Sequence, residues 1–152
     1  LGDAKHHEPI SYEVRLIPSS EPESTERQLV ALLKQSVDIT AAGGDGGMDT
    51  KHLWNFCDDQ DIQPIIKPDK NALEDTDCAS RNQEVKLRNK FGYKKWAKRR
   101  GYGHRWPATE GINSAIKRIF GEQINATSEP GMLQQAACKV WAYQRLKRYG
   151  EA

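Results

Sequence analysis

Short strand-like and helix-like segments alternate along the first part of the chain, and this order limits the folds that it can adopt. Three segments have the apolar–polar alternation or the β-branched runs of strands, at residues 10–17, 37–42 and 62–66. Two segments between them space their apolar side chains as in a helix, at residues 24–35 and 49–57. The order predicts an α/β fold with parallel strand pairing. Pro64 cannot donate a ladder hydrogen bond, so the third strand is predicted at or near an edge.

Capping residues and breaks set the expected limits of the helices. Ser24 or Thr25 can cap the first helix and Asp49 the second, because their side-chain oxygens can accept backbone N–H groups. The polar residues 67–85 have no clear period and are predicted as a loop. A basic helix is predicted at residues 83–100, with an interruption at Gly92, and a break follows at residues 101–107. Two helices with apolar stripes are predicted at residues 110–121 and 131–148.

Charge is divided unevenly along the chain. Residues 1–85 carry 8 basic and 17 acidic side chains, whereas residues 86–152 carry 15 basic and 4 acidic ones. In the basic part, lysines and arginines that can neutralise phosphates alternate with aromatic side chains that can stack on exposed bases. This pattern indicates a polyanionic partner. The alternative is a solvated helix face with its own hydrophobic anchors.

Composition and motifs exclude several classes of protein. The 152 residues are 37% hydrophobic, which fits one modest core, and include no apolar run near the ~20 residues that cross a bilayer. The three widely spaced cysteines fit neither a disulfide framework nor a C-x-x-C zinc site. No Walker loop, dinucleotide fingerprint, H-E-x-x-H or G-x-S-x-G sequence is present. We therefore expect a soluble, cytoplasmic protein that does not associate with membranes.

Two acidic residues are candidates for chemistry. Asp45 follows a predicted strand and stands between glycine pairs that let the backbone turn sharply, at the kind of strand end where ligands gather in α/β sheets. The alternative is a turn in which Asp45 only supports the bend. Glu110 shares a helix face with Lys117, two turns away and opposite the apolar stripe. Its alternatives are a favourable contact with the helix dipole or a solvated salt bridge.

Two sequence motifs resemble bacterial and archaeal insertion-sequence transposases over roughly residues 1–148. Residues 44–51 (Gly-Asp-Gly-Gly-Met-Asp-Thr-Lys), followed by residues 62–68 (Ile-Gln-Pro-Ile-Ile-Lys-Pro), resemble the second-aspartate region of that family. Residues 102–110 and Lys117 resemble its Tyr-Arg-Glu-Lys signature. The spacings Tyr102–Arg105 and Glu110–Lys117 match the common form, but four residues instead of three separate Arg105 from Glu110.

The resemblance implies an RNase H-like fold, with a mixed sheet and flanking helices, and a DDE active site. In such a site two aspartates and a glutamate hold two divalent ions, Mg²⁺ or Mn²⁺, which prefer oxygen ligands. Asp45 then corresponds to the second acid and Glu110 to the third, and the two are expected to bind the same ions. The implied partners are transposon-end and target DNA, and a homo-oligomer is possible. With the basic segment, the predicted DNA-binding residues are Tyr102, Arg105, Lys117, Lys94, Lys95, Lys98, Arg99 and Arg100.

The start of the sequence departs from the family pattern. The first catalytic aspartate of the family lies on a strand before the hairpin that residues 1–5 resemble, and Asp3 matches a hairpin aspartate instead. The resemblance thus implies the C-terminal part of a DDE domain at residues 1–148, with a tail at 149–152 and without the first strand and acid. Full strand transfer by this chain alone is not expected. The alternatives are a catalytically dead DNA-binding module and an interaction domain without nucleic-acid affinity.

Overall fold

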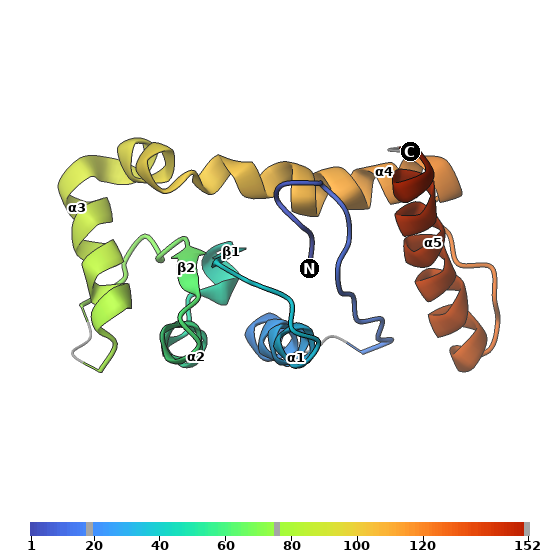
Figure 1. Ribbon diagram of the computed structural model, residues 1–152, viewed down its shortest axis with the longest axis horizontal. Helices are drawn as coiled ribbons and strands as arrows, with labels where there is room; N and C mark the ends of the chain where they lie inside the picture. Colours follow the sequence, from blue (N-terminus) through green and yellow to red (C-terminus); the bar gives the residue numbers. More distant parts are fainter. Residues whose placement is uncertain (18–19, 75–76, 151–152) are drawn as a thin grey trace. The chain divides into compact units, whose positions relative to one another are not determined.

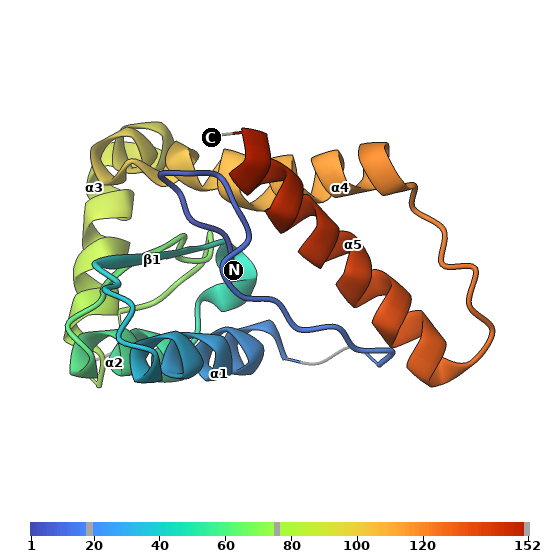
Figure 2. The same ribbon diagram turned by 45° about the vertical axis from the view of Figure 1, so that its right-hand side comes forward.

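The computed structural model describes residues 1–17, 20–74 and 77–150 (Figures 1 and 2). The chain divides into two compact units. The sheet unit comprises Ser20–Arg105, and the helical unit comprises Leu1–Ser19 and Trp106–Ala152. Over the residues described, no helix is both long and apolar enough to pass through a bilayer.

The sheet unit is built around a parallel β–α–β element. Strand β1 (Ala41–Gly44) pairs in parallel with β2 (Gln63–Ile66), and helix α2 (Lys51–Asp59) connects them. Among the described residues the sheet has only these two strands, so Pro64, opposite Ala42, lies on an edge strand as predicted. A mainly helical chain with a parallel strand pair agrees with the expected α/β class and confirms the parallel pairing.

The core of the sheet unit forms where α2 packs on β2. Helix α1 (Glu21–Lys34) and α2 lie on the same side of the sheet in both views (Figures 1 and 2). The buried side chains of the core come from α2, β2 and the residues that precede each of β2 and α3: Leu53, Trp54, Cys57, Ile62, Ile66 and Cys78. Burial raises the pKa of the Cys57 thiol to about 11, so this cysteine packs as a neutral side chain.

Helix α3 (Ala79–Arg100) is bent at Gly92, where Figure 1 shows the ribbon turning sharply. Gly92 has φ 76° and ψ 161°, a conformation that favours glycine, and it confirms the predicted interruption of the basic helix. Beyond the bend, the side chains of Trp96 and Arg100 contact a residue in the first half of the helix. The Trp96 indole donates to Glu84 Oε2 at 2.7 Å, and the Arg100 guanidinium pairs with the same carboxylate. The short 3₁₀ helix η2 (Tyr102–His104) follows.

The helical unit packs the first residues of the chain against its C-terminal helices. A Cβ atom added at Gly2 would lie 1.9 Å from the Ala108 carbonyl oxygen, and the Gln144 amide donates to the Pro9 carbonyl at 2.6 Å. Gly2 and Pro9 also form an isolated antiparallel bridge. The helical elements of the unit are the π-helical turn η3 (Pro107–Gly111), α4 (Ile112–Phe120) and α5 (Glu129–Gly150).

Two predicted strands differ from the structure. Residues 10–17 form no strand, and Ile17 is 78% exposed. Apolar–polar alternation becomes a strand only when a neighbouring strand accepts its hydrogen bonds, and no described strand pairs with this segment. The strand predicted at residues 37–42 lies instead at Ala41–Gly44, because the residues that pair with β2 include Gly43 and Gly44. Glycine has no side chain that would predict a strand from the sequence.

Three helix limits were also predicted wrongly. Helix α1 begins at Glu21, with a proline in its first turn, and is not capped by Ser24 or Thr25. Thr50, not Asp49, caps α2, because its hydroxyl accepts from the Leu53 amide at 3.4 Å. Helix α3 begins at Ala79 and not at Gln83, so residues 79–82, predicted as loop, are its first turn. The last of these errors arises because contacts with distant residues stabilise this polar segment.

Candidate functional site

Asp45 lies directly after β1, at the position where the glycine-rich turn begins. The residue is exposed, and its carboxylate oxygen Oδ1 accepts the Gly47 amide at 2.9 Å, which starts the 3₁₀ helix η1 (Gly46–Met48). One oxygen of Asp45 thus supports the bend, as the simpler interpretation of the turn predicts. The exposed carboxylate remains at the end of a strand, where the sequence placed it.

The glycines of this turn allow close approach of neighbouring groups. A Cβ atom at Gly44 would lie 2.7 Å from Cγ of Met48, so a side chain there would force the turn open. A Cβ atom at Gly47 would lie 3.2 Å from Oδ1 of Asp45 and 3.4 Å from Oε2 of Glu21. The turn is therefore compact, and the exposed Asp45 side chain extends from a tightly packed backbone.

The donor atoms of the site determine which metal ions it can bind. An exposed carboxylate is the kind of ligand that Mg²⁺ and Mn²⁺ prefer, so the chemistry of Asp45 fits such an ion. In the described parts of the chain, no group of three or more His, Cys, Asp or Glu side chains is placed to hold a metal. The described residues therefore form no preformed cage of three or more such ligands.

Arg105 packs beside β1, the strand that Asp45 follows, and Tyr102 packs against Arg105. The Arg105 Cβ atom lies 3.7 Å from the position of a Cβ atom on Gly43, and the guanidinium carbon lies 4.5 Å from the centre of the Tyr102 ring. Burial raises the pKa of the Tyr102 phenol, the positive charge of Arg105 opposes this, and the negative charge of Asp45 adds to it. The sheet unit thus brings together one predicted acid and two residues of the Tyr-Arg-Glu-Lys signature.

Tyr102 is buried, with 3% of its surface exposed, and so it supports Arg105 instead of facing solvent. Its ring lies 5.1 Å from Trp96 and 6.3 Å from Tyr93, measured between ring centres. This aromatic cluster connects η2 to the second half of α3. The predicted DNA-binding arginine therefore has a rigid support that the sequence alone did not indicate.

The second half of α3 exposes four cations, which we call the basic face: Lys94, Lys95, Lys98 and Arg99. Arg99 also lies over the Phe91 ring, 4.5 Å from its centre, and a shallow depression of about 540 Å³ is lined by these two residues with Lys95 and Lys98. Arg100, predicted to bind DNA with them, is instead engaged by the buried Glu84.

Glu110 and Lys117 belong to the helical unit. Glu110 is exposed in the π-helical turn η3, so the α-helix predicted from residue 110 begins only at Ile112. Lys117 is exposed on α4, and its ammonium group lies 3.1 Å from a carboxylate oxygen of Glu122. π-Helical turns are rare in proteins, but those that occur often lie at functional sites. Asp45 and Glu110 thus belong to different units, each on an exposed and irregular piece of backbone.

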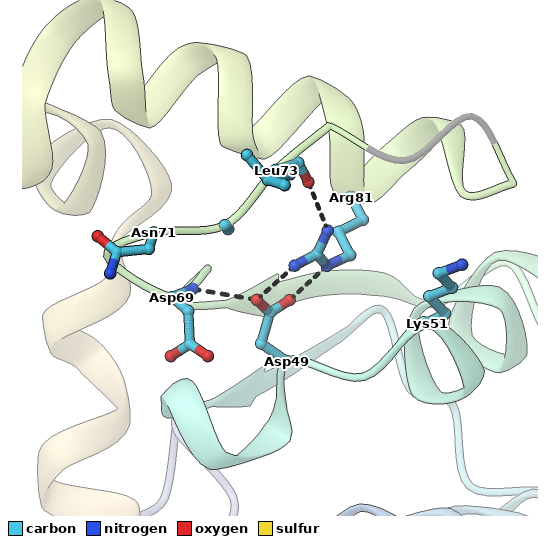
Figure 3. Close-up of a pocket in the computed structure, with 7 residues that line it drawn as sticks. Asp49, Lys51, Asp69, Asn71, Leu73 and Arg81 are labelled. Carbon is cyan, nitrogen blue, oxygen red and sulfur yellow. Dashed lines mark hydrogen bonds and ion pairs between the residues drawn. The ribbon is translucent and has the colours of Figure 1, made fainter.

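Sequence reasoning missed the role of Asp49, which it assigned to a helix cap. The Asp49 side chain is 1% exposed and forms an ion pair with Arg81, from a segment predicted as loop (Figure 3). The two residues line a depression of about 390 Å³ with neighbours from the segment after β2. No local pattern predicts this pair, because its members are 32 residues apart.

A family model described as a transposase DDE domain matches residues 2–144 of the chain. No match is found among curated proteins or among solved structures.

Proposed function

The chain belongs to the transposase DDE domain family, whose model matches residues 2–144, and we propose that it supplies metal-binding acids and DNA contacts for the DNA cleavage and strand transfer of transposition. The observation that carries the proposal is the exposed carboxylate of Asp45 at a strand end, beside Arg105 and Tyr102. The proposal takes residues 1–148 as a DDE domain of the RNase H-like type, with a tail at residues 149–152. The parallel β1–α2–β2 element supports that architecture.

Asp45 and Glu110 are proposed as the acids that bind Mg²⁺ or Mn²⁺. Both side chains are exposed, and both offer the oxygen ligands that these hard cations require. A bound pair of ions supplies activation of the attacking oxygen and stabilisation of the leaving oxygen in phosphodiester displacement. The chain itself holds the Asp45 carboxylate at the strand end through the Gly47 amide.

DNA contacts are assigned to Arg105, Lys117 and the basic face. The guanidinium of Arg105 is supported by the Tyr102 ring and can pair with a phosphate in a fixed geometry. Arg100 contributes less than its neighbours because Glu84 already neutralises its charge. We place the protein in the cytoplasm, where it would act on transposon-end and target DNA.

A nicking assay tests the acids. Supercoiled plasmid is incubated with the protein and Mn²⁺, and the rate of conversion to open circles is measured. We expect the variants Asp45→Asn and Glu110→Gln each to lower this rate about 100-fold, because each removes a charged metal ligand. Asp38→Asn and Glu129→Gln, which alter exposed acids of the same two units, should keep the rate of the unchanged chain.

Equal nicking by all five proteins would show that neither acid takes part in the reaction. DNA binding without any nicking would favour the second candidate function, a catalytically dead DNA-binding module. The basic face and its four exposed cations are the observation that supports this alternative.

A salt titration tests the basic face. Each phosphate contact contributes about 0.9 to the slope of log K against log salt concentration for duplex DNA. We expect Lys94→Ala with Lys98→Ala to reduce that slope by about 2, measured by fluorescence anisotropy of a labelled duplex.

The matched control for the salt titration is Lys51→Ala with Lys86→Ala. This pair removes the same charge from exposed lysines of the same unit, but each of these lysines has an acidic neighbour, Asp77 at 3.7 Å and Glu74 at 3.3 Å. The control should leave the slope nearly unchanged. Identical slopes for both double variants would mean that the basic face does not contact DNA.

A further inference from the structure

A single buried carboxylate, that of Asp49, joins three segments of the sheet unit (Figure 3). Its Oδ1 accepts from the Trp54 indole at 3.0 Å and from Nε of Arg81 at 2.8 Å. Its Oδ2 accepts from Nη2 of Arg81 at 2.9 Å and from the Asp69 amide at 3.0 Å. The contacts come from α2, from α3 and from the segment after β2. Four hydrogen bonds, two of them from one guanidinium, leave this carboxylate little freedom to move.

Arg81 is itself fixed at a second point. Its Nη1 donates to the Leu73 carbonyl at 3.0 Å, and its side chain is 12% exposed. The guanidinium therefore spans from Asp49 to the segment after β2, as the dashed lines in Figure 3 show. A bidentate contact of this kind fixes orientation as well as distance, which a lysine at the same position cannot do.

Asp49 also forms the far end of the turn that begins with Asp45. The Gly47 amide donates to the Asp45 side chain at 2.9 Å, the Met48 amide donates to the Asp45 carbonyl at 3.2 Å, and the Asp49 amide donates to the Gly46 carbonyl at 3.2 Å. Residues 45–49 are therefore one hydrogen-bonded turn. One end of it continues from β1, and the other end is anchored by the Asp49–Arg81 pair.

We propose that Asp49, held by Arg81, is a positioning residue that fixes the turn and thereby the orientation of the Asp45 carboxylate. The proposal rests on the proposed function, which gives Asp45 its role as a metal-binding acid. Asp49 itself does not act on DNA or on the ion. It determines how the Asp45 side chain is presented.

The test uses the full chain and two variants that weaken the anchor in different ways. Asp49→Asn removes the charge and keeps the shape, whereas Arg81→Lys keeps the charge and loses the bidentate contact. Arg81→Lys is the milder change, and it provides the measurement where Asp49→Asn does not fold. The controls are Asp59→Asn, an exposed acid of α2, and Asn71→Ala, an exposed residue that lines the same depression.

The first readout is the amide proton shift of Gly47 in an NMR spectrum, which reports its hydrogen bond to Asp45. We expect both anchor variants to move this resonance in the same direction as Asp45→Asn does. The two controls should leave it in place. An unchanged Gly47 resonance in folded Asp49→Asn or folded Arg81→Lys would overturn the proposal, whatever the protein does to DNA.

The second readout is the affinity for Mn²⁺ alone, followed by the electron paramagnetic resonance signal of the free ion. Loss of a residue that orients a metal ligand lowers affinity about 10-fold, and we expect this for Asp49→Asn. In the Asp45→Asn background the same substitution should have almost no further effect, because the ligand that it orients is absent. A merely structural role would lower affinity equally in both backgrounds and would contradict the proposal.

The two readouts separate the two hypotheses. If Asp45→Asn leaves Mn²⁺ affinity unchanged, the metal-binding role of Asp45 is wrong, and the Gly47 resonance alone decides whether Asp49 positions the turn. If Asp45→Asn lowers affinity and both anchor variants do not, the proposed function stands and the positioning role is wrong.

Discussion

Replacing Glu84 by alanine is expected to lower the free energy of unfolding by about 3 kcal/mol. Glu84 is 7% exposed and its carboxylate accepts from the Trp96 indole and pairs with Arg100. Its removal leaves a buried indole N–H without an acceptor and a guanidinium without its counter-ion. Breaking a buried pair by removing one partner generally costs about 3–5 kcal/mol. Because the Arg100 side chain is 27% exposed and can turn to water, we expect the low end of that range.

The measurement is urea unfolding followed by far-UV circular dichroism. The matched control is Glu74→Ala, because Glu74 pairs with Lys86 at 3.3 Å at an exposed position, where an ion pair contributes less than about 1 kcal/mol. Equal destabilisation by the two substitutions would show that the bend of α3 does not depend on the Glu84 contacts. A large difference would show that the buried Glu84 holds the second half of α3 to its first half.

Local sequence signals predicted the parts of the fold that depend on neighbouring residues. The apolar run at residues 62–66 became β2, and Gly92 interrupted α3 because only a residue without a side chain adopts its backbone angles at little cost. The sequence also predicted the position of Asp45 after a strand, because the glycines on both sides of it indicate a turn. These features are decided within a few residues of the chain.

Features that depend on distant contacts could not be predicted in this way. Residues 10–17 have the apolar–polar pattern of a strand, but they pair with no described strand. Such alternation indicates which side of a strand could be buried, but not whether another strand is available to pair with it. Glu84 looks like any polar residue of a basic helix, because its partners lie 12 and 16 residues away across the bend. Asp49 has the residue type of a helix cap, and only folding brings Arg81 to it.

Replacing Trp54 by alanine is expected to cost about 4 kcal/mol of stability, the largest loss that we predict. Trp54 is fully buried at the centre of the core, and its indole also donates to Asp49 at 3.0 Å. Trp54→Phe separates the two contributions, because it keeps most of the buried volume and removes the donor. A hydrogen bond to a charged group contributes about 1.5–3 kcal/mol, so this variant should lose about 2 kcal/mol.

Urea unfolding of these two variants is compared with that of Trp141→Ala. Trp141 is 53% exposed on α5, so its removal should cost less than about 1 kcal/mol. If Trp54→Phe proved as harmless as Trp141→Ala, the indole would contribute nothing to holding Asp49. If it lost about half as much as Trp54→Ala, the tryptophan would serve both as the centre of the core and as a support for the turn that carries Asp45. The same side chain would then link the stability of the sheet unit to the orientation of its exposed acid.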